Sequence, residues 1–258
     1  METLTPTCAA LEQALMQRAS VRRYDGRPVD DDLLERLLTA AARTQTMGNL
    51  QLYSVVVTRD AAQKAALAPA HFNQPMVTGA PVVLTFCADY RRTTDWCLQR
   101  KAHPGYDNFL SFINAATDAL LFCQTFCTLA EAEGLGLCYL GTTIYQPQTI
   151  IDVLHLPRLV MPVATITLGW PAGAAPLSDR LPATAFVHHE HYVQPTPESI
   201  DCDYGPREAL EENRRFCEIN HTETLAQIFT DIRYTREACE AMSQTLLDAL
   251  RRQGFLAD

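Results

Sequence analysis

Helical spacing of apolar residues is the clearest pattern along the chain. It is strongest over residues 31–43, where leucine or alanine stands at positions 33, 34, 37, 38 and 41 and Asp30 is placed to cap the first turn. Further helices are predicted over residues 8–18, 107–133, 150–154, 206–219 and 235–253. In residues 107–133 the apolar positions cover more than one stripe, so we expect that helix to be buried around most of its circumference.

Runs of β-branched residues predict the strands. Three buried strands are expected over Tyr53–Thr58, Pro81–Cys87 and Leu159–Leu168, and a short extended piece is expected within Gly134–Gly141. The resulting order of helices and strands does not alternate regularly, which favours an α+β fold over a doubly wound parallel sheet. Because the sequence becomes polar from Pro195, we expect a main domain over residues 1–195 and a helical extension over residues 196–258.

Composition narrows the functional classes. The chain has 258 residues and a formal charge of −9, which would repel phosphate backbones, so nucleic acid is not an expected partner. Nine cysteines without any C-x-x-C pair indicate reduced thiols in a reducing cytosol. No export signal is recognisable at the start, and prolines and glycines interrupt the longest uncharged stretch, Leu159–Ser178. We therefore expect a cytoplasmic protein without a membrane span.

A basic loop after the first helix is the leading candidate for ligand binding. Arg18, Ser20 and Arg22 are two residues apart, so in an extended loop their side chains share one face and can converge on a phosphate. The alternative is an ordinary solvated turn. Arg180 is another cationic candidate, but it is far from this loop in the sequence. Whether the two come together depends on the fold.

Two amides precede the first strand. Asn49 and Gln51 stand where they could read the hydrogen-bonding edge of a heteroaromatic ring, or could only stabilise a turn. Gly134, Gly136 and Gly141 follow a predicted helix rather than a strand, so they do not form a dinucleotide-binding Rossmann motif. The sequence has no P-loop.

Histidines and cysteines give weaker signals. His188, His189 and His191 lack helical metal-ligand spacing, so we expect exposed loop residues rather than a metal site. Cys123 and Cys127 lie one helical turn apart in an apolar setting, which indicates core packing. No motif for a nucleophilic serine or cysteine is present, and we expect no catalytic side chain.

Taken in order, several segments resemble the FMN-dependent nitroreductase family, in particular its NAD(P)H-dependent nitro, quinone and flavin reductases. Each segment is weakly specific alone, but their order and spacing extend over essentially the whole chain. The matching segments are residues 18–24, Val29 with the leucines of the following helix, residues 46–51, Gln74, and residues 134–141, 168–171, 180–182, 231–236 and 252–255.

The resemblance implies roles for individual residues. Arg18, Ser20, Arg22 and the backbone of Ala19 would hold the FMN phosphate together with the distant Arg180. Asn49 and Gln74 would bind the ribityl chain or pyrimidine edge, with Gln51 nearby. The backbone beside the isoalloxazine ring would come from Tyr139, Leu140, Gly141 and Thr142. Ser178 stands where related sequences often carry a second basic residue, so a weaker hold on FMN is expected.

The same resemblance implies an architecture and an activity. The expected fold is a central mixed or antiparallel sheet flanked by helices in a domain-swapped homodimer, with residues 1–195 as the FMN-binding domain and part of the helix over residues 107–133 against the partner. The implied reaction is ping-pong electron transfer from NAD(P)H to nitroaromatics, quinones or other flat electrophiles. Arg214 and Arg215 could meet an NADPH 2′-phosphate, or could be a solvated helix face.

Two other functions stay open. A flavin dehydrogenase or dehalogenase on the same scaffold would differ around Met47, Phe72 and residues 202–221. A non-enzymatic flavin- or metal-binding protein would bind without transferring electrons.

Overall fold

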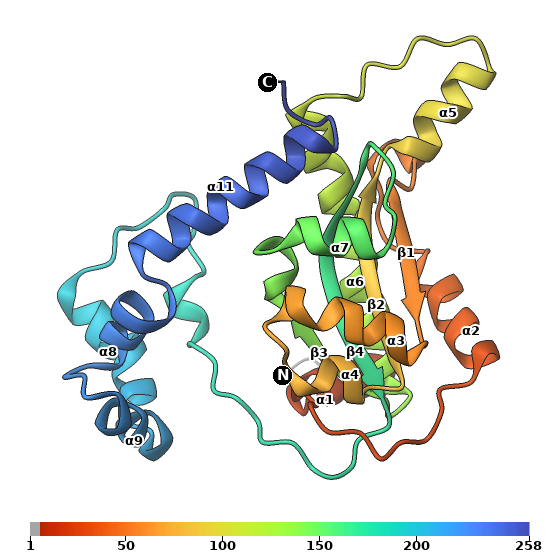
Figure 1. Ribbon diagram of the computed structural model, residues 1–258. Coiled ribbons are helices and arrows are strands. Elements are labelled where there is room, and N and C mark those ends of the chain that lie inside the picture. Colours follow the sequence, from red (N-terminus) through yellow and green to blue (C-terminus); the bar gives the residue numbers. More distant parts are fainter. Residues whose placement is uncertain (1–5, 258) are drawn as a thin grey trace. The chain divides into compact units, whose positions relative to one another are not determined.

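A four-stranded antiparallel sheet organises the chain in the computed structural model, which describes residues 6–257. Its strands are β1 (Tyr53–Thr58), β2 (Val82–Asp89), β3 (Gly136–Leu140) and β4 (Val160–Gly169), in the order β1-β2-β4-β3 (Figure 1). The predicted strands and the α+β class are confirmed, and every neighbouring pair is antiparallel. Residues 1–5, where the search for an export signal begins, and Asp258, where the predicted extension ends, lie outside the described residues.

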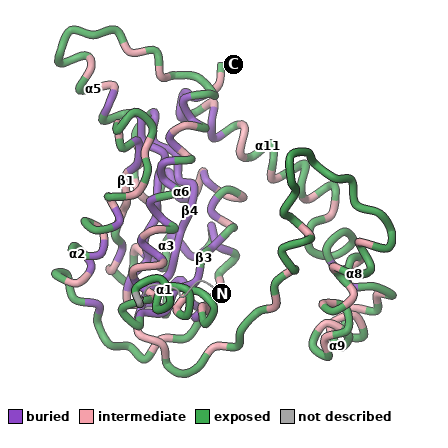
Figure 2. Tube along the Cα trace, turned by 180° about the vertical axis from the view of Figure 1, so that it is seen from behind, coloured by how far each residue is buried: buried purple, intermediate pink, exposed green. Residues whose placement is uncertain are grey.

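Helices cover both faces of the sheet because β2 alternates between two apolar clusters. Val82, Leu84, Phe86 and Ala88 belong to the cluster of α6 (Phe109–Ala132) and α2 (Asp31–Ala41). Val83 belongs to the cluster on the opposite face, formed with α3 (Ala61–Leu67), α4 (Pro75–Gly79) and α7 (Pro147–Val153). β2 is therefore buried along its whole length, and the buried residues gather along the sheet and α6 (Figure 2).

The long helix α6 differs from its prediction. It is long and apolar enough to cross a membrane, yet it packs on the sheet through Phe112, Ala119, Phe122 and Phe126 and also buries Asp118, as a core helix does. Its other side is open in the single chain. Exposed apolar residues there are Phe109, Leu110, Ile113, Leu120 and Leu121. The expectation of burial around most of the circumference is wrong for one chain, because these five side chains stay exposed among residues 6–257.

Other boundaries also differ. α1 (Pro6–Met16) begins and ends two residues earlier than predicted, and α2 ends at Ala41 rather than position 43. Asp30 occupies the N-cap position of α2, but its side chain makes no capping hydrogen bond. Helices α3 and α4, together with α5 (Arg91–Gln99), were not expected from the sequence.

The chain forms two compact units. The first unit contains the sheet and consists of two segments, the chain up to Leu177 and the chain from Met242 onward. The second unit covers Ser178–Ala241. The second unit holds η4 (Ala183–Ala185), α8 (Pro197–Glu208), α9 (Glu211–Asn220), α10 (Leu225–Gln227) and the π-helical turn η5 (Ile228–Arg233). α11 (Arg236–Arg252) follows. The single helix predicted over residues 206–219 is wrong, because Leu210 is extended and separates α8 from α9.

Candidate functional site

The basic loop is held against the sheet through its backbone. The Val21 N–H donates to the Leu137 carbonyl of β3 at 2.9 Å, and Tyr24 forms a β-bridge with Pro171 just after β4. The Asp25 N–H donates to Trp170 at 3.0 Å, and the Ala172 N–H donates back to Arg23 at 3.0 Å. Through these bonds residues 21–25 run beside β3 and beside the residues that follow β4.

Two glycines allow this close approach. A Cβ on Gly136 would lie 2.7 Å from the Val21 side chain, and one on Gly169 would lie 2.6 Å from Pro81 and 2.9 Å from Tyr24. The Tyr24 hydroxyl lies 2.7 Å from Thr167 Oγ1 and donates to the Val21 carbonyl at 2.9 Å, and burial raises its pKa. The loop therefore depends on small residues in the strands beneath it.

The loop places Arg18 beside Ser20, and it places Ser20 and Arg22 on one cavity. Arg18 Nη2 lies 3.5 Å from the Ser20 hydroxyl, while Arg18 Nε donates to Glu131 on α6 at 3.1 Å. Burial raises the pKa of the Cys138 thiol, and the positive charges of Arg22 and Arg18 oppose that shift. A cavity of about 280 Å³, lined by residues 20–23 and 172–176, opens beside the loop. Arg18 thus contacts Ser20, and Ser20 and Arg22 share a cavity wall, while convergence of all three on a phosphate stays a prediction.

The amide loop, residues 46–52 with Asn49 and Gln51, is organised by Asp118, which was not predicted to belong to the site. Asp118 is 1% exposed and accepts hydrogen bonds from the Thr46 hydroxyl at 2.6 Å, the Met47 N–H at 2.9 Å and the Leu52 N–H at 3.2 Å. Asn49 and Gln51 both adopt positive φ between these bonds. The available signal was a single carboxylate in the middle of a predominantly apolar helix.

A second turn lies beside the end of β3. His71 closes η2 (Ala68–His71), and Gln74 follows it at the start of α4. His71 is fully buried, and its Nδ1 lies 2.8 Å from the hydroxyl of Thr142 in η3 (Gly141–Ile144). Burial lowers the pKa of His71 to about 4. The structure therefore joins the Gln74 turn to the 139–142 segment, a link that sequence spacing did not reveal.

The 139–142 segment leaves the sheet at this point. Leu140 is buried, whereas Tyr139 and Gly141 are exposed and Thr142 is partly exposed. Partial burial raises the pKa of Tyr139, and the Cys123 and Cys127 thiols contribute to that shift. Both cysteines are buried at 3% and 5% exposure, so the prediction of core packing is confirmed.

The remaining candidates lie in the second unit. Arg180 donates to the carbonyl of Asp179 at 2.7 Å, and the Asp179 carboxylate pairs with Arg207 at 2.5 Å. Arg214 and Arg215 are exposed on α9. His188, His189 and His191 are exposed as predicted, and no metal-binding group of three His, Cys, Asp or Glu side chains occurs among residues 6–257.

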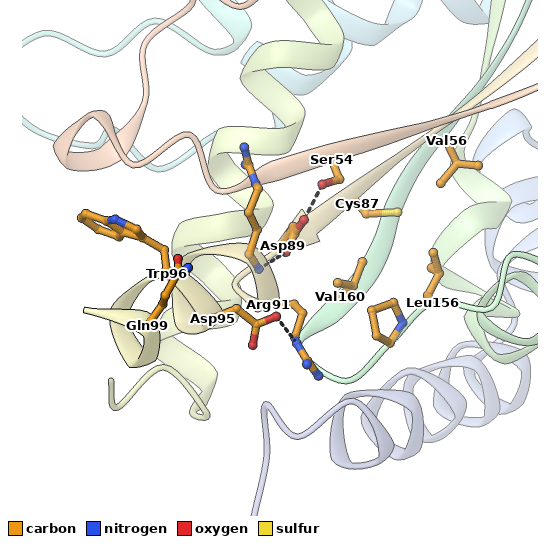
Figure 3. A pocket seen from close by; sticks show the side chains of 12 residues that line it. Ser54, Val56, Cys87, Asp89, Arg91, Asp95, Trp96, Gln99, Leu156 and Val160 are labelled. Atoms are coloured by element: carbon orange, nitrogen blue, oxygen red, sulfur yellow. Dashed lines mark hydrogen bonds and ion pairs between the residues drawn. The ribbon is translucent and has the colours of Figure 1, made fainter. Parts of the chain in front are cut away.

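A larger cavity of about 680 Å³ lies elsewhere in the sheet unit (Figure 3). Its lining comes from β1, β2, the start of β4, α5 and the turn at Leu156 and Pro157, and includes none of the residues predicted for the site. Asp89 accepts hydrogen bonds there from the Ser54 hydroxyl and the Arg92 N–H, and Arg91 pairs with Asp95 at 2.7 Å. Because these charged groups already have partners, volume alone does not make this cavity the candidate site.

Comparison with known proteins agrees with this architecture. The sequence model of the nitroreductase family matches residues 15–170. An oxygen-insensitive NADPH nitroreductase of Salmonella typhimurium is 31% identical over 192 residues, which cover 74% of this chain and 78% of that protein. An NAD(P)H-dependent FMN reductase of Bacillus subtilis is 29% identical over 188 residues, or 70% of this chain and 74% of that protein.

A solved structure is more similar still. A crystal structure of a Bacteroides fragilis NCTC 9343 protein superposes with a TM-score of 0.94 at 55% identity, and the match covers 95% of this chain and 100% of that one. Residues 15–170, which the family model matches, contain the basic loop, the amide loop with Asp118, the turn at His71 and all four strands. On this evidence the chain belongs to the nitroreductase family, whose members named here are NAD(P)H-dependent flavin and nitro reductases.

Proposed function

We propose that the protein is an FMN-dependent oxidoreductase that transfers electrons from NAD(P)H to nitroaromatics, quinones or related flat electrophiles. The observation that carries this proposal is the backbone-held basic loop, in which Arg18 lies 3.5 Å from the Ser20 hydroxyl while Ser20 and Arg22 line a cavity. Two cations and a hydroxyl suit a phosphate ester, which accepts several charge-assisted hydrogen bonds. The relatives named as an FMN reductase and an NADPH nitroreductase support the same class.

The residues present suit FMN at both ends of the molecule. Arg18, Ser20, Arg22 and the Ala19 backbone would hold the phosphate, with Arg180 as the proposed third cation and Ser178 supplying no charge. Asn49, Gln51 and Gln74 would offer amides to the ribityl chain and pyrimidine edge. Tyr139, Leu140, Gly141 and Thr142 would lie beside the ring. When bound, FMN supplies the electron carrier between nicotinamide and acceptor.

The chain's own groups bind and orient rather than react. Glu131 engages Arg18 through Nε and the Ser20 hydroxyl lies 3.5 Å from Nη2, which leaves Nη1 and one N–H of Nη2 available to an anion. Asp118 holds the backbone that carries Asn49 and Gln51. No side-chain nucleophile is required, and one pocket would serve NAD(P)H and the acceptor in turn, which is ping-pong kinetics.

The proposed assembly is a cytoplasmic, domain-swapped homodimer. Support comes from the exposed apolar side chains of two helices, because an uncovered patch of this kind is typical of a protein interface. They are Leu11, Leu15 and Met16 of α1 and Phe109, Leu110, Ile113, Leu120 and Leu121 of α6. In this proposal residues 1–195 form the FMN-binding domain, and residues 196–258 form a helical extension that packs on the same domain or its partner.

The activity is tested by following the flavin colour. FMN-reconstituted protein under nitrogen should be bleached by NADPH or NADH, and a nitrofuran or quinone should restore the yellow colour. A yellow protein that neither nucleotide bleaches would be a flavin binder only. Bleaching without reoxidation by either acceptor would instead favour a dehydrogenase or dehalogenase on this scaffold.

The phosphate assignment makes a separate prediction. Arg22→Ala should weaken FMN binding by about 10- to 150-fold, the loss of a charge-assisted hydrogen bond of roughly 1.5–3 kcal/mol. Riboflavin lacks the phosphate, so its affinity should not change. Fluorescence titration with both flavins measures this difference. Arg27→Ala is the control, since Arg27 pairs with Asp25 and lies over Trp170; equal losses for FMN and riboflavin would contradict the assignment.

A further inference from the structure

A buried histidine reaches the proposed ring site through one contact. His71 is fully buried, its Nδ1 lies 2.8 Å from Thr142 Oγ1, and its Nε2 has no hydrogen-bond partner among the described residues. The two residues are 71 positions apart in sequence, on the separate short helices η2 and η3. Thr142 is partly exposed, so the buried imidazole bonds to a residue that reaches the accessible side of the turn.

The surroundings of the imidazole determine its protonation. Burial is the cause of its lowered pKa, so the ring is neutral near pH 7 and carries one N–H. A proton on Nε2 would be a buried donor without an acceptor, and orphaned donors of that kind are rarer than bare acceptors. A proton on Nδ1 instead donates to Thr142 Oγ1. The Thr142 hydroxyl then has its own proton free to donate elsewhere.

We propose that His71 is a positioning residue that holds the Thr142 hydroxyl as a hydrogen-bond donor for the ring portion of the flavin, and fixes the Gly141–Thr142 backbone beside it. This rests on the proposed FMN function. The effect belongs to the ring end of the ligand, because Thr142 closes the 139–142 segment while the phosphate loop is formed by residues 18–22. Loss of the contact therefore weakens FMN and riboflavin alike, unlike the loss of Arg22.

The test uses a set of matched variants. Thr142→Val removes the hydroxyl with little change of shape, and His71→Leu removes the imidazole. His71→Asn keeps an N–H close to the Nδ1 position. Thr142→Val and His71→Leu should each raise the Kd for both flavins by about fivefold, the size of one neutral hydrogen bond, and shift the flavin absorption maximum in the same direction. His71→Asn should restore most of the affinity.

Coupling between the two residues decides the outcome. If His71 acts through Thr142, the double variant with His71→Leu and Thr142→Val should bind both flavins no more weakly than Thr142→Val alone. Thr78→Val, on the neighbouring helix α4, is the control and should bind both flavins as the wild type does. Additive losses in the double variant, or a His71→Asn variant no better than His71→Leu, would overturn the proposal.

The two proposals fail differently. A wild-type protein that binds neither flavin contradicts the proposed function, whereas normal flavin binding by Thr142→Val contradicts only the role of His71. If His71→Leu does not fold, as judged by near-UV circular dichroism, Thr142→Val and His71→Asn still give the decision, because an unchanged absorption maximum in Thr142→Val overturns the proposal.

Discussion

Replacing Asp118 with alanine is expected to lower the free energy of unfolding by about 4 kcal/mol, because buried donors would lose a charged acceptor. Asp118 is 1% exposed and accepts hydrogen bonds from the Thr46 hydroxyl and the Met47 and Leu52 N–H groups. Without the carboxylate the Leu52 N–H stays buried without this partner. Urea unfolding followed by far-UV circular dichroism measures the loss.

Two further variants separate this effect from general damage to α6. Asp118→Asn keeps one acceptor oxygen but turns an NH₂ group toward the other donors, so about half of the loss is expected. Thr117→Ala removes only an exposed hydroxyl that bonds within the helix, and should change stability by less than about 0.5 kcal/mol. Flavin affinity should fall in the Asp118 variants, because Asn49 and Gln51 lose their support. If Asp118→Ala has the same free energy of unfolding as the wild type, the loop over residues 46–52 is held by other contacts.

His71 is expected to make the protein's stability depend on pH between about 6.5 and 4. Its pKa is lowered from 6.5 to about 4 by burial in the folded chain. Between these values the unfolded chain binds a proton that the folded chain does not. The contribution of His71 to the free energy of unfolding is therefore complete above pH 6.5 and is lost as the pH falls toward 4. The difference amounts to roughly 3 kcal/mol at pH 4.

Urea unfolding of the wild type at pH 7.5, 6.0, 5.0 and 4.5 measures this slope. His71→Leu and His71→Asn both remove the titrating group, so both should show a flatter profile than the wild type, whatever their stability at pH 7.5. A wild-type slope in both variants would mean that another group, not His71, takes up the proton on unfolding.

Local sequence patterns predicted the larger elements and missed the small ones. The β-branched run of β1 matches its strand at both ends, because a strand buried in a sheet needs those residues at consecutive positions. Helix α5 was missed because only Thr93 of its nine residues is buried, so it has no apolar stripe to detect. The break at Leu210 was missed because leucine carries no turn signal, and its extended backbone is a local feature of the second unit.

The candidate site shows the same division. The two-residue spacing of Arg18 and Ser20 was enough to predict that their side chains meet, because alternation along an extended segment is a local property. It could not show that Gly136 and Gly169 let the loop lie on the sheet, since those contacts join distant segments. Asp118 and His71 were missed for the same reason: their partners are 66 or more residues away in the sequence.

The sequence by itself determined the α+β class, the four strands, the core helix and the resemblance to the nitroreductase family. These follow from local periodicity and from motifs in a set order. Only the tertiary structure decided which face of α6 stays open, that Asp118 organises the amide loop and that His71 meets Thr142. Burial and hydrogen bonding between distant segments depend on how the chain packs, and packing is not encoded in any short stretch of it.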